Sequence, residues 1–197
     1  MELRARNTCR LPVDYHRRTT IDLKRNRGFN LWVQGTAGAV AVLAIALGIR
    51  LELPAAATWG PLATTVLTIL AGLCYLAAHE LTHGLVLRWR TGVKPTYAVK
   101  FPFVTTGSPA YLNPGTTTFV ALAPSLLWGA ILLTALLLVP AELRLTLYIL
   151  VVLNFAGSSG DYVEAAVALR QPPESLIRDD GKEIGIYRPR ESDPATD

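Results

Sequence analysis

The chain has 197 residues, of which 51% are hydrophobic and only 17% are charged, and its mean hydropathy is +0.32. A soluble domain carries about 25% charged residues, so this composition argues against a soluble enzyme, a disordered tail or a nucleic-acid binder. Charged residues are missing from three long blocks, residues 30–49, 53–78 and 101–141. Each block exceeds the roughly 18 apolar residues that indicate a bilayer-spanning helix. The sequence therefore predicts a multi-pass membrane protein.

Four apolar segments are long enough to cross a bilayer and are predicted as helices: residues 29–49, about 59–87, 118–139 and 143–169. We therefore expect an all-α membrane protein with four transmembrane helices. The helices form one membrane domain, residues 29–169. It is preceded by a basic leader, residues 1–28, and followed by a polar tail, residues 170–197, in which residues 183–187 resemble a short strand.

The distribution of Lys and Arg predicts the orientation. The leader holds eight of them, residues 88–100 hold four and the tail holds five, whereas the two remaining connectors hold one each. Lys and Arg accumulate in the cytoplasmic loops of membrane proteins. We therefore expect a multi-pass protein of the cell membrane with both termini in the cytoplasm. The basic residues flank the apolar blocks and are interpreted as topology signals, so the lipid bilayer is an expected partner and nucleic acid is not.

The candidate catalytic residues lie near the end of the second segment, where residues 79–83 read His-Glu-Leu-Thr-His. Positions i and i+4 share one face of a helix, so His79 and His83 can reach one Zn²⁺ ion. Glu80 is placed to act as a general base on a water molecule at that metal. Ionisable residues within a membrane are costly, which favours a functional role. The structural alternative is that Glu80 pairs with a neighbouring helix.

A catalytic zinc ion usually has three protein ligands, and the sequence offers several donors for the third. Asp161 in the fourth segment is preferred, because Asp161 and His83 both lie about 10–14 Å from the predicted cytoplasmic boundary. Glu164, which is nearer this boundary, is the competitor. Cys74 is off the ligand face of its helix and is expected to pack as a small apolar residue. His16 lies in the leader and is expected at the surface.

The fourth segment is interrupted by small and polar residues at 154–160, which read Asn-Phe-Ala-Gly-Ser-Ser-Gly. The two glycines allow the helix to unwind or another backbone to approach closely. Packing of helices through small residues accounts for the same pattern. The first residue of this stretch, Asn154, is placed to hydrogen-bond either a substrate carbonyl or a neighbouring helix.

These motifs resemble those of the putative zincin peptidases, small multi-pass bacterial membrane proteins related in design to the site-2 proteases. The resemblance rests on residues 79–84, 107–111, 121–124 and 157–161, and it covers the chain from about residue 70 onward. In site-2 proteases two histidines and an aspartate hold zinc within the membrane, and a glutamate is the base. The resemblance implies these roles for four residues of this chain: His79, His83, Asp161 and Glu80. Asp161 is followed by tyrosine, whereas the site-2 proteases have glycine there.

Residues 91–117, between the second and third segments, are predicted to be non-helical because Pro and Gly interrupt them repeatedly. Apolar and aromatic residues alternate with others from Tyr97 to Phe103, which is the pattern of a strand, and Gly107 and Pro109 could turn the chain back. By resemblance to the site-2 proteases, such a re-entrant β-hairpin could dip into the cytoplasmic leaflet and add a strand to an unwound substrate helix. The alternative is an amphipathic loop at the lipid headgroups.

These features predict an integral-membrane zinc metallopeptidase that hydrolyses a peptide bond near the cytoplasmic face. Its expected substrate is a membrane-anchored protein or peptide. One alternative is a non-catalytic scaffold or regulator that retains the zinc. A second is a metal or proton carrier that uses His79, Glu80 and Asp161 as a relay. The small number of spans and the lack of an inverted repeat disfavour the carrier.

Overall fold

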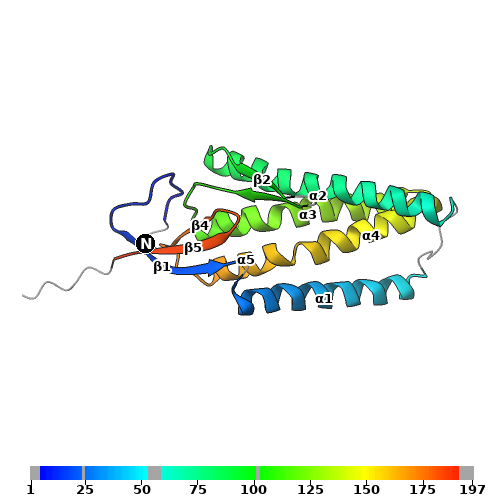
Figure 1. The fold of residues 1–197 in the computed structure, drawn as a ribbon, viewed down its shortest axis with the longest axis horizontal. Helices are drawn as coiled ribbons and strands as arrows, with labels where there is room; N and C mark the ends of the chain where they lie inside the picture. Colours follow the sequence, from blue (N-terminus) through cyan, green and yellow to red (C-terminus); the bar gives the residue numbers. More distant parts are fainter. Residues whose placement is uncertain (1–4, 24, 53–58, 101–102, 191–197) are drawn as a thin grey trace, which may run out of the picture.

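The structure is a computed structural model that describes residues 5–23, 25–52, 59–100 and 103–190. Its elements, in chain order, are β1 (Tyr15–Asp22), α1 (Arg27–Arg50), α2 (Pro61–Thr91), β2 (Thr96–Lys100), β3 (Phe103–Gly107), α3 (Pro114–Leu138), α4 (Ala141–Gly157), α5 (Ser159–Leu169), β4 (Leu176–Asp179) and β5 (Glu183–Pro189). The helices run along the long axis of the molecule, and strands β1, β4 and β5 gather at one end (Figure 1).

Within the described ranges, four helical spans are long and apolar enough to cross a membrane: α1, α2, α3, and α4 together with α5. The prediction of a mostly helical protein with four spans long and apolar enough to cross a membrane is therefore confirmed. Helix α3 begins four residues earlier than predicted, because Pro114 occupies its first turn and the Asn113 side chain caps it by accepting a hydrogen bond from the Thr116 N–H at 2.8 Å. Helix α2 extends to Thr91 and ends at Gly92, which has a φ of 72°.

The fourth span is broken where its small residues lie. Helix α4 ends at Gly157, α5 begins at Ser159, and Ser158 between them has φ −76° and ψ 10°. The hydroxyls of Ser158 and Ser159 donate hydrogen bonds of 2.7 and 2.6 Å to backbone carbonyls of the preceding turn. The break restarts the helix two residues before Asp161, so that this aspartate lies in the first turn of α5.

The centre of the bundle is formed by α2, α3 and α4, whose buried apolar cluster comprises Tyr75, Leu132, Leu150 and Val151. Helix α1 packs against α4 and α5 at the side of the bundle. Helices α3 and α4 approach closely at Gly129, where an added Cβ atom would lie 2.9 Å from the Phe155 ring and 3.2 Å from the Asn154 amide nitrogen. This close approach fixes the position of Asn154 relative to α3.

The leader and the tail together form an antiparallel sheet in the order β1-β5-β4. Only the region of β5 was predicted from the sequence. Strand β1 was missed because its exposed Arg and Thr residues show no apolar alternation, and β4 because it has only four residues. The sheet docks on the bundle through hydrogen bonds between Leu112 and Ile177, both of 2.7 Å, and from the Ser108 N–H to the Asp179 carbonyl at 2.9 Å. Both ends of the described chain therefore lie at this end of the bundle.

Strands β2 and β3 form the predicted hairpin, but its turn differs from the prediction. Lys100 pairs with Phe103, so the chain reverses between these two residues and not at Gly107 and Pro109. Residues 101 and 102, which join the two strands, lie outside the described residues. Whether the hairpin re-enters the membrane stays a prediction.

Replacing Gly129 with alanine tests the packing of α3 against α4. We expect Gly129→Ala to lower the free energy of unfolding by about 1–3 kcal/mol, because its methyl group overlaps the Phe155 ring. The measurement is the melting temperature of the detergent-solubilised protein. Gly38→Ala is the matched control, since an added Cβ there would have no neighbour within 4 Å. Equal melting temperatures for the two variants would contradict the close approach.

Candidate active site

The candidate site lies where α2 faces the first turn of α5. His79 Nε2 is 3.2 Å from Asp161 Oδ2, and His83 Nε2 is 3.3 Å from Asp161 Oδ1. One carboxylate thus faces two imidazoles, each through a different oxygen. The helical i, i+4 spacing places the two rings on one face of α2, with their centroids 5.0 Å apart.

The other ring nitrogen of each histidine is held by a second group. His83 Nδ1 donates to the Val120 carbonyl at 3.0 Å, and His79 Nδ1 is 3.0 Å from the Tyr75 hydroxyl. The Tyr75 hydroxyl uses its one O–H to donate a hydrogen bond to Asn154 Oδ1 at 2.8 Å, so it accepts a hydrogen bond from the His79 Nδ1–H. In the neutral form of both rings, each Nε2 atom therefore presents a lone pair toward Asp161.

Two lone pairs that face a carboxylate require positive charge between them. Protonation of both rings would supply this charge, but it would leave two charged imidazoles within the apolar part of the bundle, which is unfavourable. A single divalent cation supplies the same charge while both imidazoles stay neutral. In a tetrahedral zinc site with bonds of about 2.0–2.1 Å, neighbouring ligand atoms are about 3.3 Å apart. The two Nε2-to-oxygen distances have this value. The donor set therefore fits a zinc ion.

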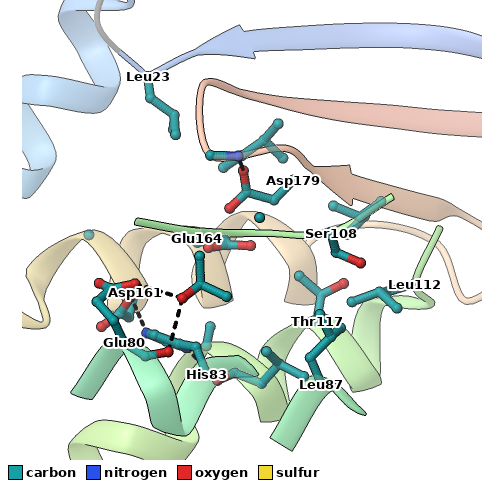
Figure 2. Close-up of a pocket in the computed structure, with 18 of the residues that line it drawn as sticks. Leu23, Glu80, His83, Leu87, Ser108, Leu112, Thr117, Asp161, Glu164 and Asp179 are labelled. Atoms are coloured by element: carbon teal, nitrogen blue, oxygen red, sulfur yellow. Dashed lines mark hydrogen bonds and ion pairs between the residues drawn. The ribbon is translucent and has the colours of Figure 1, made fainter. Parts of the chain in front are cut away.

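Glu80 lies beside this set but is held differently. Ligand atoms of His79, Glu80 and His83 all lie within 4.8 Å of one another. The Thr106 hydroxyl on β3 lies 2.9 Å from both the Glu80 carbonyl and Glu80 Oε2, which act as acceptors. Glu80 also lines a cavity of about 240 Å³ together with His83 and Asp161 (Figure 2). The Glu80 carboxylate thus lies next to the candidate metal site and at the wall of the cavity, which can admit water or substrate.

The hairpin can lie close to α2 because residue 84 is glycine. A Cβ atom at Gly84 would lie 3.0 Å from Pro95 and 2.7 Å from the Tyr97 ring. The absence of a side chain immediately after His83 therefore allows β2 and β3 to cover the helix at the site. This contact brings Thr106 within reach of Glu80.

The other candidates from the sequence lie apart from the two imidazoles. Glu164 lines the same cavity as Asp161, but it makes no ion pair with either histidine. His16 is on β1 and is absent from the cavity wall. Cys74 is exposed on α2, so the expectation that it packs inside the protein was wrong.

Asn154 is fully buried and its amide is used between helices. Its Oδ1 accepts from Tyr75, and its Nδ2 donates to the Ser125 carbonyl at 3.1 Å. Of the two roles that the sequence left open, these contacts favour the hydrogen bond to neighbouring helices. The Asn154 side chain fixes the Tyr75 hydroxyl and, through it, the orientation of His79.

Sequence reasoning missed the residues that support the site. Tyr75 lies four residues before His79, and this helical spacing was a signal that could have identified it. Thr106 and the Val120 carbonyl come from distant elements, and no pattern in the sequence connects them with residues 79–83.

Comparison with known proteins agrees with this geometry. The family described as putative zincin peptidases matches residues 72–177, and the chain belongs to this family. The matched region begins before His79 on α2 and extends through Asp161 into β4. No curated protein and no solved structure matches the chain.

Zinc content tests the ligand assignment. We expect His79→Ala, His83→Ala and Asp161→Ala to lose most of the zinc that the purified wild type holds, because each removes one of three donors. Glu164→Ala is the matched control and should retain about one zinc per chain. The measurement is elemental analysis of the purified protein by mass spectrometry. Zinc loss in Glu164→Ala with retention in Asp161→Ala would contradict the assignment.

Asp179, on β4 at the cavity wall, tests the electrostatics of the site. Burial raises the pKa of its carboxyl from 3.8 to about 6, the charges of Asp180 and Asp161 act in the same direction, and a hydrogen bond from the Gly181 N–H opposes the shift. The folded state therefore holds this proton more tightly than the unfolded state, and ionisation costs stability as the pH rises from about 4 through about 6.

We expect Asp179→Asn to stabilise the protein by about 1–3 kcal/mol at pH 8 and not at pH 3.5. Asparagine removes the charge and can still accept from Gly181. The measurement is the melting temperature across this pH range. Asp14→Asn is the control, because Asp14 is exposed and is absent from the cavity wall. A stabilisation by Asp179→Asn that does not change with pH would show that charge is not its cause.

Proposed function

We propose that the protein is an integral-membrane zinc metallopeptidase that hydrolyses a peptide bond in a membrane-anchored protein or peptide. The observation that carries this proposal is the arrangement of Glu80, whose carboxylate lies beside the paired imidazoles and lines the adjoining cavity. Membership of the zincin peptidase family supports the same chemistry.

In this proposal His79, His83 and Asp161 hold the zinc ion, and Tyr75 and Asn154 keep His79 in position. A zinc ion bound there would supply a Lewis acid that polarises the substrate carbonyl and lowers the pKa of a bound water molecule toward about 7. Glu80 accepts a proton from the attacking water molecule and donates it to the leaving amine. Thr106 holds one carboxylate oxygen of Glu80 at 2.9 Å and thereby orients it.

Strand β3 offers a place for an extended substrate. Among the described residues it pairs only with β2, and its Thr106 contacts Glu80 on the neighbouring α2. An unwound segment of a substrate that adds to the free edge of β3 would lie next to Glu80. The positive charge of residues 88–100 and of both termini supports a position of this site near the cytoplasmic face of the cell membrane.

Substitution of Glu80 by glutamine tests catalysis separately from metal binding. We expect Glu80→Gln to keep its zinc but to lose at least about 10²-fold in turnover, because glutamine can accept from Thr106 but cannot accept the proton. Membranes of cells that express each variant are compared by mass spectrometry of new protein termini. Cleavage products should accumulate with the wild type and be absent with Glu80→Gln.

Glu142→Gln is the matched control, because Glu142 lies in the first turn of α4, far along the chain from the site and absent from the cavity wall. It should yield the same products as the wild type. If a cellular phenotype of the wild type survives in Glu80→Gln and is lost in His79→Ala, the protein acts as a zinc-dependent scaffold and the proposed peptidase activity is refuted.

A further inference from the structure

The cavity beside Glu80 continues beyond the candidate zinc ligands. Its far wall carries two more carboxylates, Glu164 from α5 and Asp179 from β4 (Figure 2). The wall also contains Ser108 and Thr117, and its larger apolar members include Phe29, Leu87, Leu112, Ile177 and Ile184. Two of these, Ile177 and Ile184, each have only 1% of their surface exposed, so the wall belongs to the packed core.

Within the described residues, the two additional carboxylates form no ion pair, and the described cavity wall contains no Lys or Arg. The neighbouring cation, Arg178, donates to the Tyr111 hydroxyl at 3.3 Å and stacks on that ring, and it is likewise absent from the cavity wall. Asp179 accepts one hydrogen bond, from the Gly181 N–H at 2.7 Å.

Glu164 has fewer hydrogen-bond partners than Asp179. Glu164 is half-buried, its side chain lines the cavity, and within the described residues it takes part in no hydrogen bond or ion pair. A zinc ion at the histidines would be offset by Asp161 and Glu80, which leaves Glu164 and Asp179 without a counter-charge. Acids that line a cavity without such a partner can bind a cation that enters from outside.

We propose that this part of the cavity binds a basic side chain, lysine or arginine, of the substrate next to the bond that is cleaved. The inference rests on the proposed peptidase function. The apolar wall suits the methylene stem of such a side chain, and the carboxylates at its end suit the charged head. A second metal ion fits less well, because apart from Glu80, His83 and Asp161 these two carboxylates are the only charged donors in the cavity wall.

Two probes test this specificity without requiring cleavage. Both are dipeptide hydroxamates, which anchor on zinc, and they differ in one side chain: lysine in one and norleucine, which keeps the stem but lacks the charge, in the other. Their affinities for the zinc-loaded full-length protein are measured by titration calorimetry. We expect the lysine probe to bind at least tenfold more tightly to the wild type. Glu164→Gln and Asp179→Asn should each reduce this preference, and the double variant should abolish it.

Asp180→Asn is the matched control and should retain the full preference, because Asp180 is exposed and lies outside the cavity wall. Equal affinities of the two probes for the wild type would overturn the proposal while leaving the peptidase function intact. A clear preference without cleavage of any membrane protein would refute the peptidase function alone. Failure of both probes to bind would overturn both, and a second zinc ion that Glu164→Gln removes would show a metal site instead.

Discussion

The structure depends on one electrostatic constraint: a carboxylate and two imidazole nitrogens face each other inside an apolar helical bundle. Asp161 contacts His79 and His83 at 3.2 and 3.3 Å. The Tyr75 hydroxyl and the Val120 carbonyl take the other nitrogen of each ring, so both lone pairs point toward the same carboxylate. In a membrane, this arrangement needs positive charge between the carboxylate and the two ring nitrogens. One divalent cation supplies that charge without the two charged imidazoles that protonation would create.

The rest of the fold serves to bring these groups together. The interruption at Ser158 ends α4 and lets α5 restart, which places Asp161 at the level of the histidines. Gly84 admits the hairpin next to α2, so that Thr106 reaches Glu80. The sheet made from the leader and the tail then closes the end of the bundle and contributes Asp179 to the cavity wall. Segments that are far apart in sequence thus line one cavity.

The sequence was sufficient to predict the features that depend on local spacing. Helix periodicity brought His79 and His83 to one face, the length of the apolar segments identified the spans, and matching depth selected Asp161, which the structure places against both histidines. The contacts of Thr106 and Asp179 could not be predicted, because they depend on how the hairpin and the sheet dock on the bundle. Strand β1 could not be predicted either. It is a strand because it pairs with β5, and its own sequence lacks an alternating pattern that would indicate a strand.

The central claim is that His79, His83 and Asp161 surround a single zinc ion, and X-ray absorption spectroscopy at the zinc edge tests it most directly. For the wild-type protein we predict only nitrogen and oxygen neighbours at about 2.0–2.1 Å, with the outer-shell scattering of two imidazoles, and loss of one oxygen neighbour in Asp161→Ala. A sulfur neighbour at about 2.3 Å, or a spectrum that Asp161→Ala leaves unchanged, would contradict this account.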